Sequence, residues 1–111
     1  CEGFYYPGLE SLAAGKLNIA PEYGGQLDFL NNTNSLLVSG KIERANPSSM
    51  YWTPKNNAEW FVPNIDDAVD KLRYAYNNFQ EKNDQLKKDS SKIINEYCWD
   101  NIVNKINNLC I

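Results

Sequence analysis

The residues best suited to chemistry lie near the start of the chain, in the stretch EGFYYPGLE, where Glu2 and Glu10 stand eight positions apart. Between them come a glycine-containing loop and a proline that opens an expected helix. Such a loop lets backbone amides approach a ligand closely, and a helix start directs unpaired N–H groups and a partial positive charge at one point. This combination suits a diphosphate. Because Pro7 cannot donate a hydrogen bond, we expect the amides of Gly8 and Leu9 to face that ligand.

The two glutamates flank this loop and helix start. Glu10, in the first turn of the expected helix, is a carboxylate that only accepts hydrogen bonds, so it can take both hydroxyls of a vicinal diol such as ribose. Glu2, before the loop, can accept hydroxyls at the other end of the same ligand. In the alternative interpretation, Glu10 complements the helix dipole and Glu2 is a solvated loop residue.

Function classes that depend on histidine are excluded, because the 111 residues contain none. A Ser–His–Asp triad, a histidine-ligated zinc hydrolase site and a phosphohistidine mechanism each lose their central residue. The net charge of -3 and the scattered basic residues predict no nucleic-acid partner. No metal or other cofactor is expected, and we interpret Asp66, Asp67 and Asp70 as complementing the dipole of the helix that they open, rather than as a metal or diphosphate site.

The length bounds the organisation of the chain. With 42% hydrophobic residues, residues 1–111 allow one small domain but not two domains with a cleft between them. No apolar run approaches the ~20 residues of a membrane span. The cysteines Cys1, Cys98 and Cys110 show no CxxC spacing, which indicates free thiols in a reducing compartment. We therefore expect a cytoplasmic chain, cut from a longer polypeptide because no initiator methionine precedes Cys1.

Short helices and strands that alternate should position the motif. Pro7 and Gly15 bound an expected helix over residues 7–14, and an apolar strand follows at residues 17–20. A Gly-Gly pair then opens a short helix over residues 26–30, and a polar turn leads to a second strand over residues 35–39, which suits burial on both faces. The order predicts an α/β fold with a parallel sheet.

The rest of the chain divides into a long loop and three helices. Residues 40–63 hold three of the five prolines and show no regular period, so a long loop is expected there, either shaping the site or decorating it. Asn64 is the expected N-cap of a helix over residues 65–79. Helices are also expected over residues 83–97, with Leu86, Ile93, Ile94 and Tyr97 inward, and over residues 99–109, whose apolar stripe is Trp99, Ile102, Val103, Ile106 and Leu109.

The motif in this setting resembles the E-x7-E signature of the C-terminal, donor-binding domain of retaining glycosyltransferases with the GT-B fold. The likeness continues in order along most of the chain, in the segments KLNIA, YGGQ, NSLLV, VPNID and YCWD. The resemblance implies a partial Rossmann-like parallel sheet with a helical C-terminal tail. It also implies that residues 1–111 are one partial domain of such an enzyme.

The resemblance assigns a role to each part of the motif. In that family the motif contacts the donor sugar, the diphosphate and the ribose in order along the chain. Carried over by position, Glu2 contacts the sugar as the candidate catalytic residue, and the amides of Gly3, Phe4 and Tyr5 hold the sugar. The amides of Gly8 and Leu9 face the diphosphate, and Glu10 binds the ribose. Tyr5 stands where the family usually has glycine, and its phenol is expected to narrow the sugar pocket.

The implied reaction is transfer of a hexosyl group from a nucleoside diphosphate sugar to a hydroxyl acceptor. The partners are therefore the nucleotide-sugar donor and an N-terminal acceptor-binding domain, with peripheral membrane contact of the parent enzyme. The basic pair that neutralises the diphosphate lies upstream of the motif in the family, so these 111 residues alone are expected to be inactive.

Two alternatives stay open. The chain is either a non-catalytic interaction module with a glycosyltransferase-like fold, or part of another enzyme of the same superfamily, such as a phosphorylase or a sugar-phosphate synthase. In the interaction module, the apolar last helix would dock a partner. The isolated chain is expected to self-associate through the apolar stripe of that helix or to leave the stripe exposed.

Overall fold

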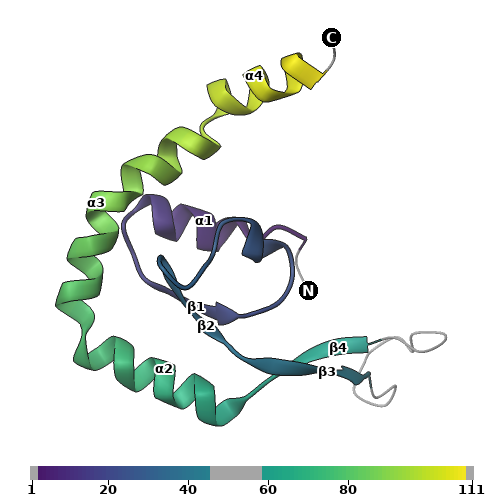
Figure 1. The fold of residues 1–111 in the computed structure, drawn as a ribbon, viewed down its shortest axis with the longest axis vertical. Coiled ribbons are helices and arrows are strands. Elements are labelled where there is room, and N and C mark those ends of the chain that lie inside the picture. Colours follow the sequence, from purple (N-terminus) through teal and green to yellow (C-terminus); the bar gives the residue numbers. More distant parts are fainter. Residues whose placement is uncertain (1–2, 46–58, 110–111) are drawn as a thin grey trace.

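The computed structural model describes residues 3–45 and 59–109 (Figure 1). Its elements alternate between helix and strand in the first half and are helical in the second. In chain order they are α1 (Tyr6–Ala13), β1 (Asn18–Pro21), the 3-10 helix η1 (Gly25–Asp28), β2 (Ser35–Val38), β3 (Gly40–Arg44), β4 (Glu59–Pro63), α2 (Ile65–Asn77), α3 (Phe79–Tyr97) and α4 (Trp99–Leu109). The described chain is therefore a mixed α/β structure, as predicted.

The two strands nearest the motif form a parallel pair, which confirms the expected parallel sheet in this part of the chain. Asn18 pairs with Ser35 and Pro21 with Val38, and the crossover between the strands passes through η1. Both strands lie within one residue of their expected ranges. The second expected helix is shorter than predicted, because Phe29 and Leu30 leave η1 and turn into the core.

The two ends of α1 follow the sequence, but Glu10, which was expected in the first turn, lies past it because the helix already begins at Tyr6. Pro7 lies in the first turn, and Gly15 adopts a φ of 67° just past the end of the helix. The amide of Gly15 donates to the carbonyl of Leu12 at 2.8 Å, and that of Lys16 donates to Ser11 at 2.9 Å. This is the Schellman arrangement, which satisfies the last carbonyls of a helix and requires a left-handed residue where Gly15 stands.

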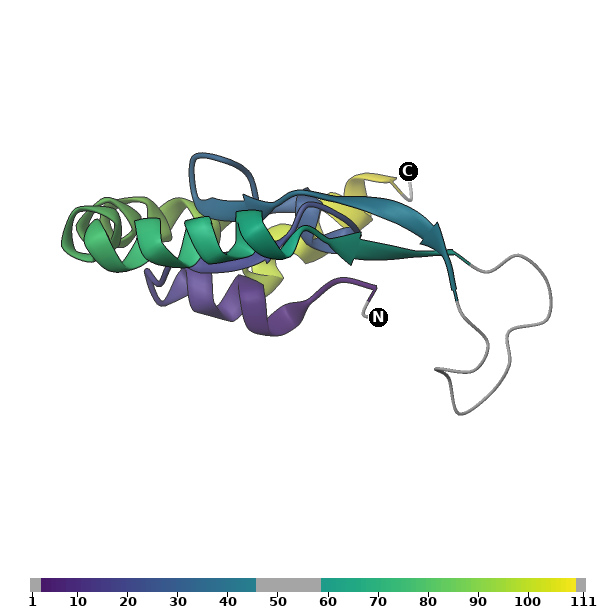
Figure 2. The ribbon, with the colours of Figure 1, turned by 90° about the horizontal axis from the view of Figure 1, so that it is seen from below.

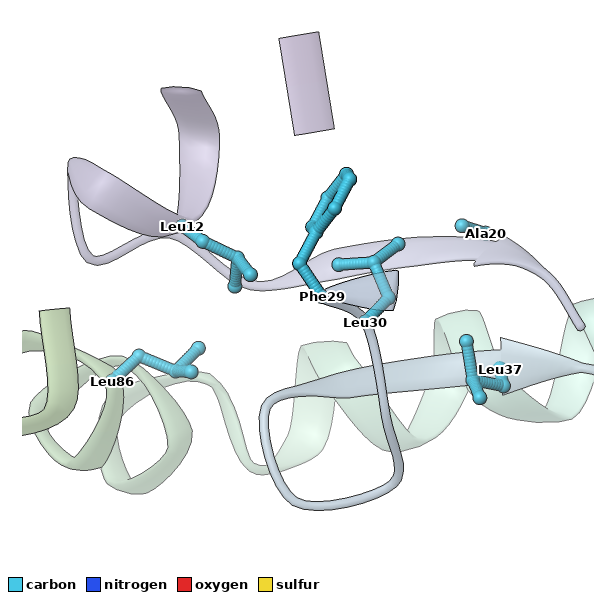
Figure 3. Close-up of a cluster of buried hydrophobic side chains, with 6 residues drawn as sticks. All are labelled: Leu12, Ala20, Phe29, Leu30, Leu37 and Leu86. Carbon is cyan, nitrogen blue, oxygen red and sulfur yellow. The ribbon is translucent and has the colours of Figure 1, made fainter. Parts of the chain in front are cut away.

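The core lies between α1, the parallel strands and α3 (Figure 3). It is made of apolar side chains from α1, β1, the segment after η1, β2 and α3, so residues far apart in the sequence share one cluster. Its buried members are Leu12, Ala20, Phe29, Leu30, Leu37 and Leu86. Leu12 and Leu30 are the most deeply buried, and they fix α1 and the chain after η1 against the sheet.

The expectation of a loop over residues 40–63 is wrong at both ends. Strands β3 and β4 pair antiparallel there, from Gly40 opposite Pro63 to Arg44 opposite Glu59. The middle of the expected loop, residues 46–58, lies outside the described residues. Sequence periodicity missed the hairpin because it extends away from the core (Figure 1), so neither of its faces has a strictly apolar pattern.

Helices α2, α3 and α4 follow one another in an arc around the outside of α1 and the strands (Figure 1). Asn64 caps α2 as predicted, and its side-chain oxygen accepts hydrogen bonds from the amides of Asp66 at 3.0 Å and Asp67 at 3.3 Å. The boundary between α2 and α3 differs from the prediction, because α2 ends at Asn77 and α3 already begins at Phe79.

The apolar faces of α2 and α4 are largely exposed. Within the described chain neither helix has a buried residue, and Ile94, expected inward on α3, is also exposed. Figure 2 shows why: the molecule is thin, with extents of 48 × 44 × 19 Å, so few elements have neighbours on both sides. The radius of gyration of 17.1 Å compares with about 13 Å for a compact domain of this size.

Within the described residues, no helix combines the length and the apolar character that crossing a membrane requires.

Candidate functional site

The candidate site lies at the carboxyl ends of β1 and β2, where open parallel sheets place their ligands. The loop before α1 reaches this edge and lies against the Gly-Gly turn that follows β1. A Cβ built on Gly25 would overlap the carbonyl oxygen of Gly3 and come within 3.3 Å of the Cα of Phe4. Only glycine at position 25 allows this approach, so the structure brings together two segments that the resemblance singles out.

The hairpin contributes a third segment to the same edge. Tyr23, in the turn after β1, stacks on Phe61 of β4 with ring centroids 5.2 Å apart and planes only 5° from parallel. A Cβ on Gly40 would overlap the Phe61 ring, so glycine is needed at the start of β3 as well. The base of the hairpin is thereby held beside the Gly-Gly turn.

The backbone of Tyr5 turns the chain into α1. Tyr5 has φ 66° and ψ 58°, and its carbonyl accepts hydrogen bonds from the amides of Gly8 at 3.1 Å and Leu9 at 3.4 Å. These are the two amides expected to face a diphosphate, and in this structure they serve the first turn of the helix. Gly8 is buried, and its carbonyl accepts a hydrogen bond from the buried side-chain amide of Asn18 at 3.2 Å. The start of α1 is thus fastened to β1.

Phe4 anchors the motif loop in an aromatic cluster. Its ring lies 5.2 Å from that of Phe29 and 6.4 Å from that of Tyr97, at the end of α3. The Tyr97 hydroxyl donates to the carbonyl of Asp28 at 3.1 Å. Burial, followed by the negative charges of Glu96 and Asp28, raises the pKa of Tyr97 above its ordinary value. Tyr97, the first residue of the YCWD segment that the resemblance places at the opening of the last helix, therefore packs directly against the motif.

The structure places the two glutamates of the motif differently. Glu2 lies outside the described residues, so its position relative to the loop is not described. Glu10 is exposed and lines an open cavity of about 230 Å³ between α1 and the end of α3, together with Leu9, Ala13, Ile93, Ile94, Tyr97 and Cys98. This cavity is almost entirely apolar apart from Glu10. Tyr97 borders both this cavity and the aromatic cluster around Phe4.

The sequence did not predict a polar contact between Ser39, which directly follows β2, and Asp67 of α2. The carboxylate of Asp67 accepts hydrogen bonds from the amide of Ser39 at 2.7 Å and from its hydroxyl at 2.8 Å. These two bonds, with a smaller effect of Lys71, hold the pKa of Asp67 below its ordinary value. The only sequence signal was the expected helix start at Asn64. No local sequence pattern around Ser39 indicates that it binds the Asp67 carboxylate.

Asp70, also on α2, has an ordinary ion-pair partner on the helix surface. Asp70 lies 3.7 Å from Arg73, one turn later on the exposed face. Across residues 3–45 and 59–109, no group of three side chains gathers in the way that a metal site would require. A cavity of about 380 Å³ does open beside the cap, lined by Ser39, Gly40, Lys41, Val62, Pro63 and Asn64.

Comparison of the chain with protein-family models gives no match, and comparisons with curated proteins and with solved structures give none either.

Proposed function

We propose that the chain is the C-terminal portion of the nucleotide-sugar-binding domain of a retaining glycosyltransferase with the GT-B fold. The observation that carries this proposal is the contact between Gly3 and Gly25. Two segments of the resemblance, the E-x7-E loop and the Gly-Gly turn, meet at the edge where an α/β sheet binds its ligands. The fold that we propose with this function is a partial Rossmann-like arrangement, of which β1, β2 and α1 form one part.

In this proposal the loop supplies backbone groups and the glutamates supply carboxylates. Glu2, with Gly3 and Phe4, faces the donor sugar, and Glu10 accepts hydrogen bonds from the ribose hydroxyls. The diphosphate lies near the start of α1, where the helix dipole favours negative charge. The amides of Gly8 and Leu9 donate to the Tyr5 carbonyl. They therefore favour the diphosphate mainly through the helix dipole and less through direct hydrogen bonds.

Transfer requires more than these 111 residues supply. A departing diphosphate needs cations or preorganised donors, and one helix start provides only part of that stabilisation. The basic pair and the acceptor-binding domain that the resemblance implies belong upstream of the motif. We therefore expect donor binding by this chain and hexosyl transfer by the longer polypeptide, without a bound metal and in the cytoplasm.

The test is calorimetric titration of UDP, GDP and ADP into both this chain and the polypeptide encoded by the whole reading frame. Glu10→Ala should weaken binding by about 1–3 kcal/mol, because a carboxylate that binds a diol makes charge-assisted hydrogen bonds. Glu81→Ala, an exposed glutamate in the first turn of α3, is the matched control and should leave the affinity unchanged. If none of the nucleotides binds to the whole polypeptide, the proposed function is wrong.

A second candidate is an interaction module that keeps this fold without catalysis. The exposed apolar faces of α2 and α4 favour it, because surfaces of that kind mark contact sites for other proteins. Weak nucleotide binding that Glu10→Ala does not change would favour this candidate over the enzyme.

A further inference from the structure

Tyr5 holds a backbone conformation that aromatic residues rarely adopt. Among the residues that the structure describes, it is the single non-glycine residue with a positive φ. An aromatic side chain in the left-handed region carries a conformational cost, and such a residue persists only where surrounding contacts maintain it. The contacts around Tyr5 therefore show what maintains the turn.

Gly8 contacts both the ring and the backbone of Tyr5. A Cβ built on Gly8 would overlap Cδ1 and Cε1 of the Tyr5 ring, so the ring lies directly against the Gly8 backbone. The Tyr5 carbonyl also accepts the Gly8 amide at 3.1 Å. Ring and backbone of Tyr5 thus both contact one buried glycine, and the ring lies against the first turn of α1.

The turn at Tyr5 sets the position of the two residues before it. The Phe4 ring is seated against Phe29, and the Gly3 carbonyl lies against Gly25. If Tyr5 moved to an extended or right-handed conformation, the chain would leave the helix in another direction and these two contacts could not both remain.

We propose that Tyr5 is a positioning residue, and that its packing on Gly8 holds Gly3 and Phe4 against the Gly-Gly turn. The positioning is a property of the loop itself, whereas its effect on ligand affinity rests on the proposed function. Glycine, which usually stands at this position in the resembled family, can adopt such a turn at little cost. Here Tyr5 keeps the turn, and Gly8 becomes the residue on which it depends.

The test is a double-mutant cycle in the 111-residue chain with Tyr5→Gly, Gly8→Ala and the two combined. Gly8→Ala alone should displace the ring, shift the NMR amide signals of Gly3 and Gly25, and weaken UDP or GDP binding at least fivefold. In the Tyr5→Gly background the ring is gone, so the same Gly8→Ala change should shift neither amide signal and alter affinity less than twofold. Tyr5→Phe, which keeps the ring, should behave like the unmodified chain.

The outcomes separate the two proposals. Equal effects of Gly8→Ala in both backgrounds, or Gly3 and Gly25 signals that it leaves unmoved, would overturn the role of Tyr5. Coupled shifts of the amide signals without binding of any nucleotide would support that role and count against the donor-binding function. If Gly8→Ala alone prevents folding, the cause is the overlap of its Cβ with the Tyr5 ring. In that case the double variant Tyr5→Gly with Gly8→Ala, which lacks the ring, should fold. The double variant Tyr5→Phe with Gly8→Ala, which keeps the ring, should remain unfolded. Folding of both or neither would contradict the proposal.

Discussion

The Asp67 carboxylate binds both the amide and the hydroxyl of Ser39, a residue 28 positions earlier in the chain. The amide of Asn64 donates back to the Ser39 carbonyl at 2.8 Å. Ser39 is the single residue between β2 and β3, so these bonds fix the point at which the chain passes from the parallel pair to the hairpin. The first turn of α2 thereby determines where the hairpin begins.

Replacement of Asp67 by Ala should destabilise the fold more than replacement of its exposed neighbour Asp66 by Ala. Both changes remove a charge from the start of α2, but only the first removes the acceptor of the Ser39 bonds. Urea denaturation of both variants at pH 7 measures the difference. Equal losses of stability would show that the Ser39 contact contributes nothing beyond the helix dipole.

The same contact should depend on pH. Hydrogen bonds from Ser39 lower the pKa of Asp67 in the folded state below 3.8, so the unfolded chain binds a proton at higher pH than the folded chain does. The stability that the contact contributes is therefore complete above pH 3.8 and disappears as the pH falls through the lowered pKa. Urea titrations between pH 7 and pH 2 should show the unmodified chain and Asp67→Asn converging at the acid end. A constant difference would contradict the assignment.

Gly25→Ala should lower stability by about 1–3 kcal/mol, which is typical of overpacking, because its Cβ would overlap the Gly3 carbonyl. Gly3→Ala is a fitting control on the other side of the same contact, since a Cβ there meets nothing within 4 Å. Thermal denaturation followed by circular dichroism compares the two. Similar melting temperatures for both variants would mean that the loop does not rest on the Gly-Gly turn.

Tyr97→Ala should cost about 2 kcal/mol or more, because it removes the ring that packs on Phe4 and Phe29. Tyr97→Phe keeps that packing and loses only the hydrogen bond to Asp28, so about 0.5 kcal/mol is expected. Tyr76→Ala provides the control, because that ring is 86% exposed. Chemical denaturation ranks the three variants. A loss for Tyr76→Ala as large as that for Tyr97→Ala would refute the anchoring role.

The exposed stripe of α4 should make the isolated chain self-associate. Val103, Ile106 and Leu109 are all exposed, and clustered apolar surface of this kind favours association. Ile106→Asp should shift light scattering toward the monomer and reduce binding of a hydrophobic dye. Asn107→Asp adds the same charge to an adjacent position and should change neither. A monomeric unmodified chain that binds no dye would contradict this prediction.

Local signals predicted the elements of this fold well. Pro7 and Gly15 bound α1, Asn64 caps α2, and the short apolar runs around Ile19 and Leu37 form the parallel pair. Each of these depends on the backbone preferences of a few neighbouring residues. The C-terminal helices were also predictable, because their apolar residues recur at helical spacing over many turns.

Contacts between distant segments were not predictable in the same way. The hairpin requires Ile42 to pair with Phe61, and neither strand has a clean alternation that would indicate it. The contact between Ser39 and Asp67 depends on how α2 is placed against β2. For the candidate site, the glycine spacing indicated the close approach of the loop, but the left-handed turn of Tyr5 had no signal, since tyrosine is not favoured there.

The fixed base of the hairpin bears on how this chain can vary in evolution. Because Gly40 pairs with Pro63 and the Ser39 bonds hold the adjoining backbone, the register of β3 and β4 is determined at the end nearest the core. That register does not depend on the length of the connection between Arg44 and Glu59. Homologous chains should therefore differ in length there more readily than anywhere between Gly3 and Val38.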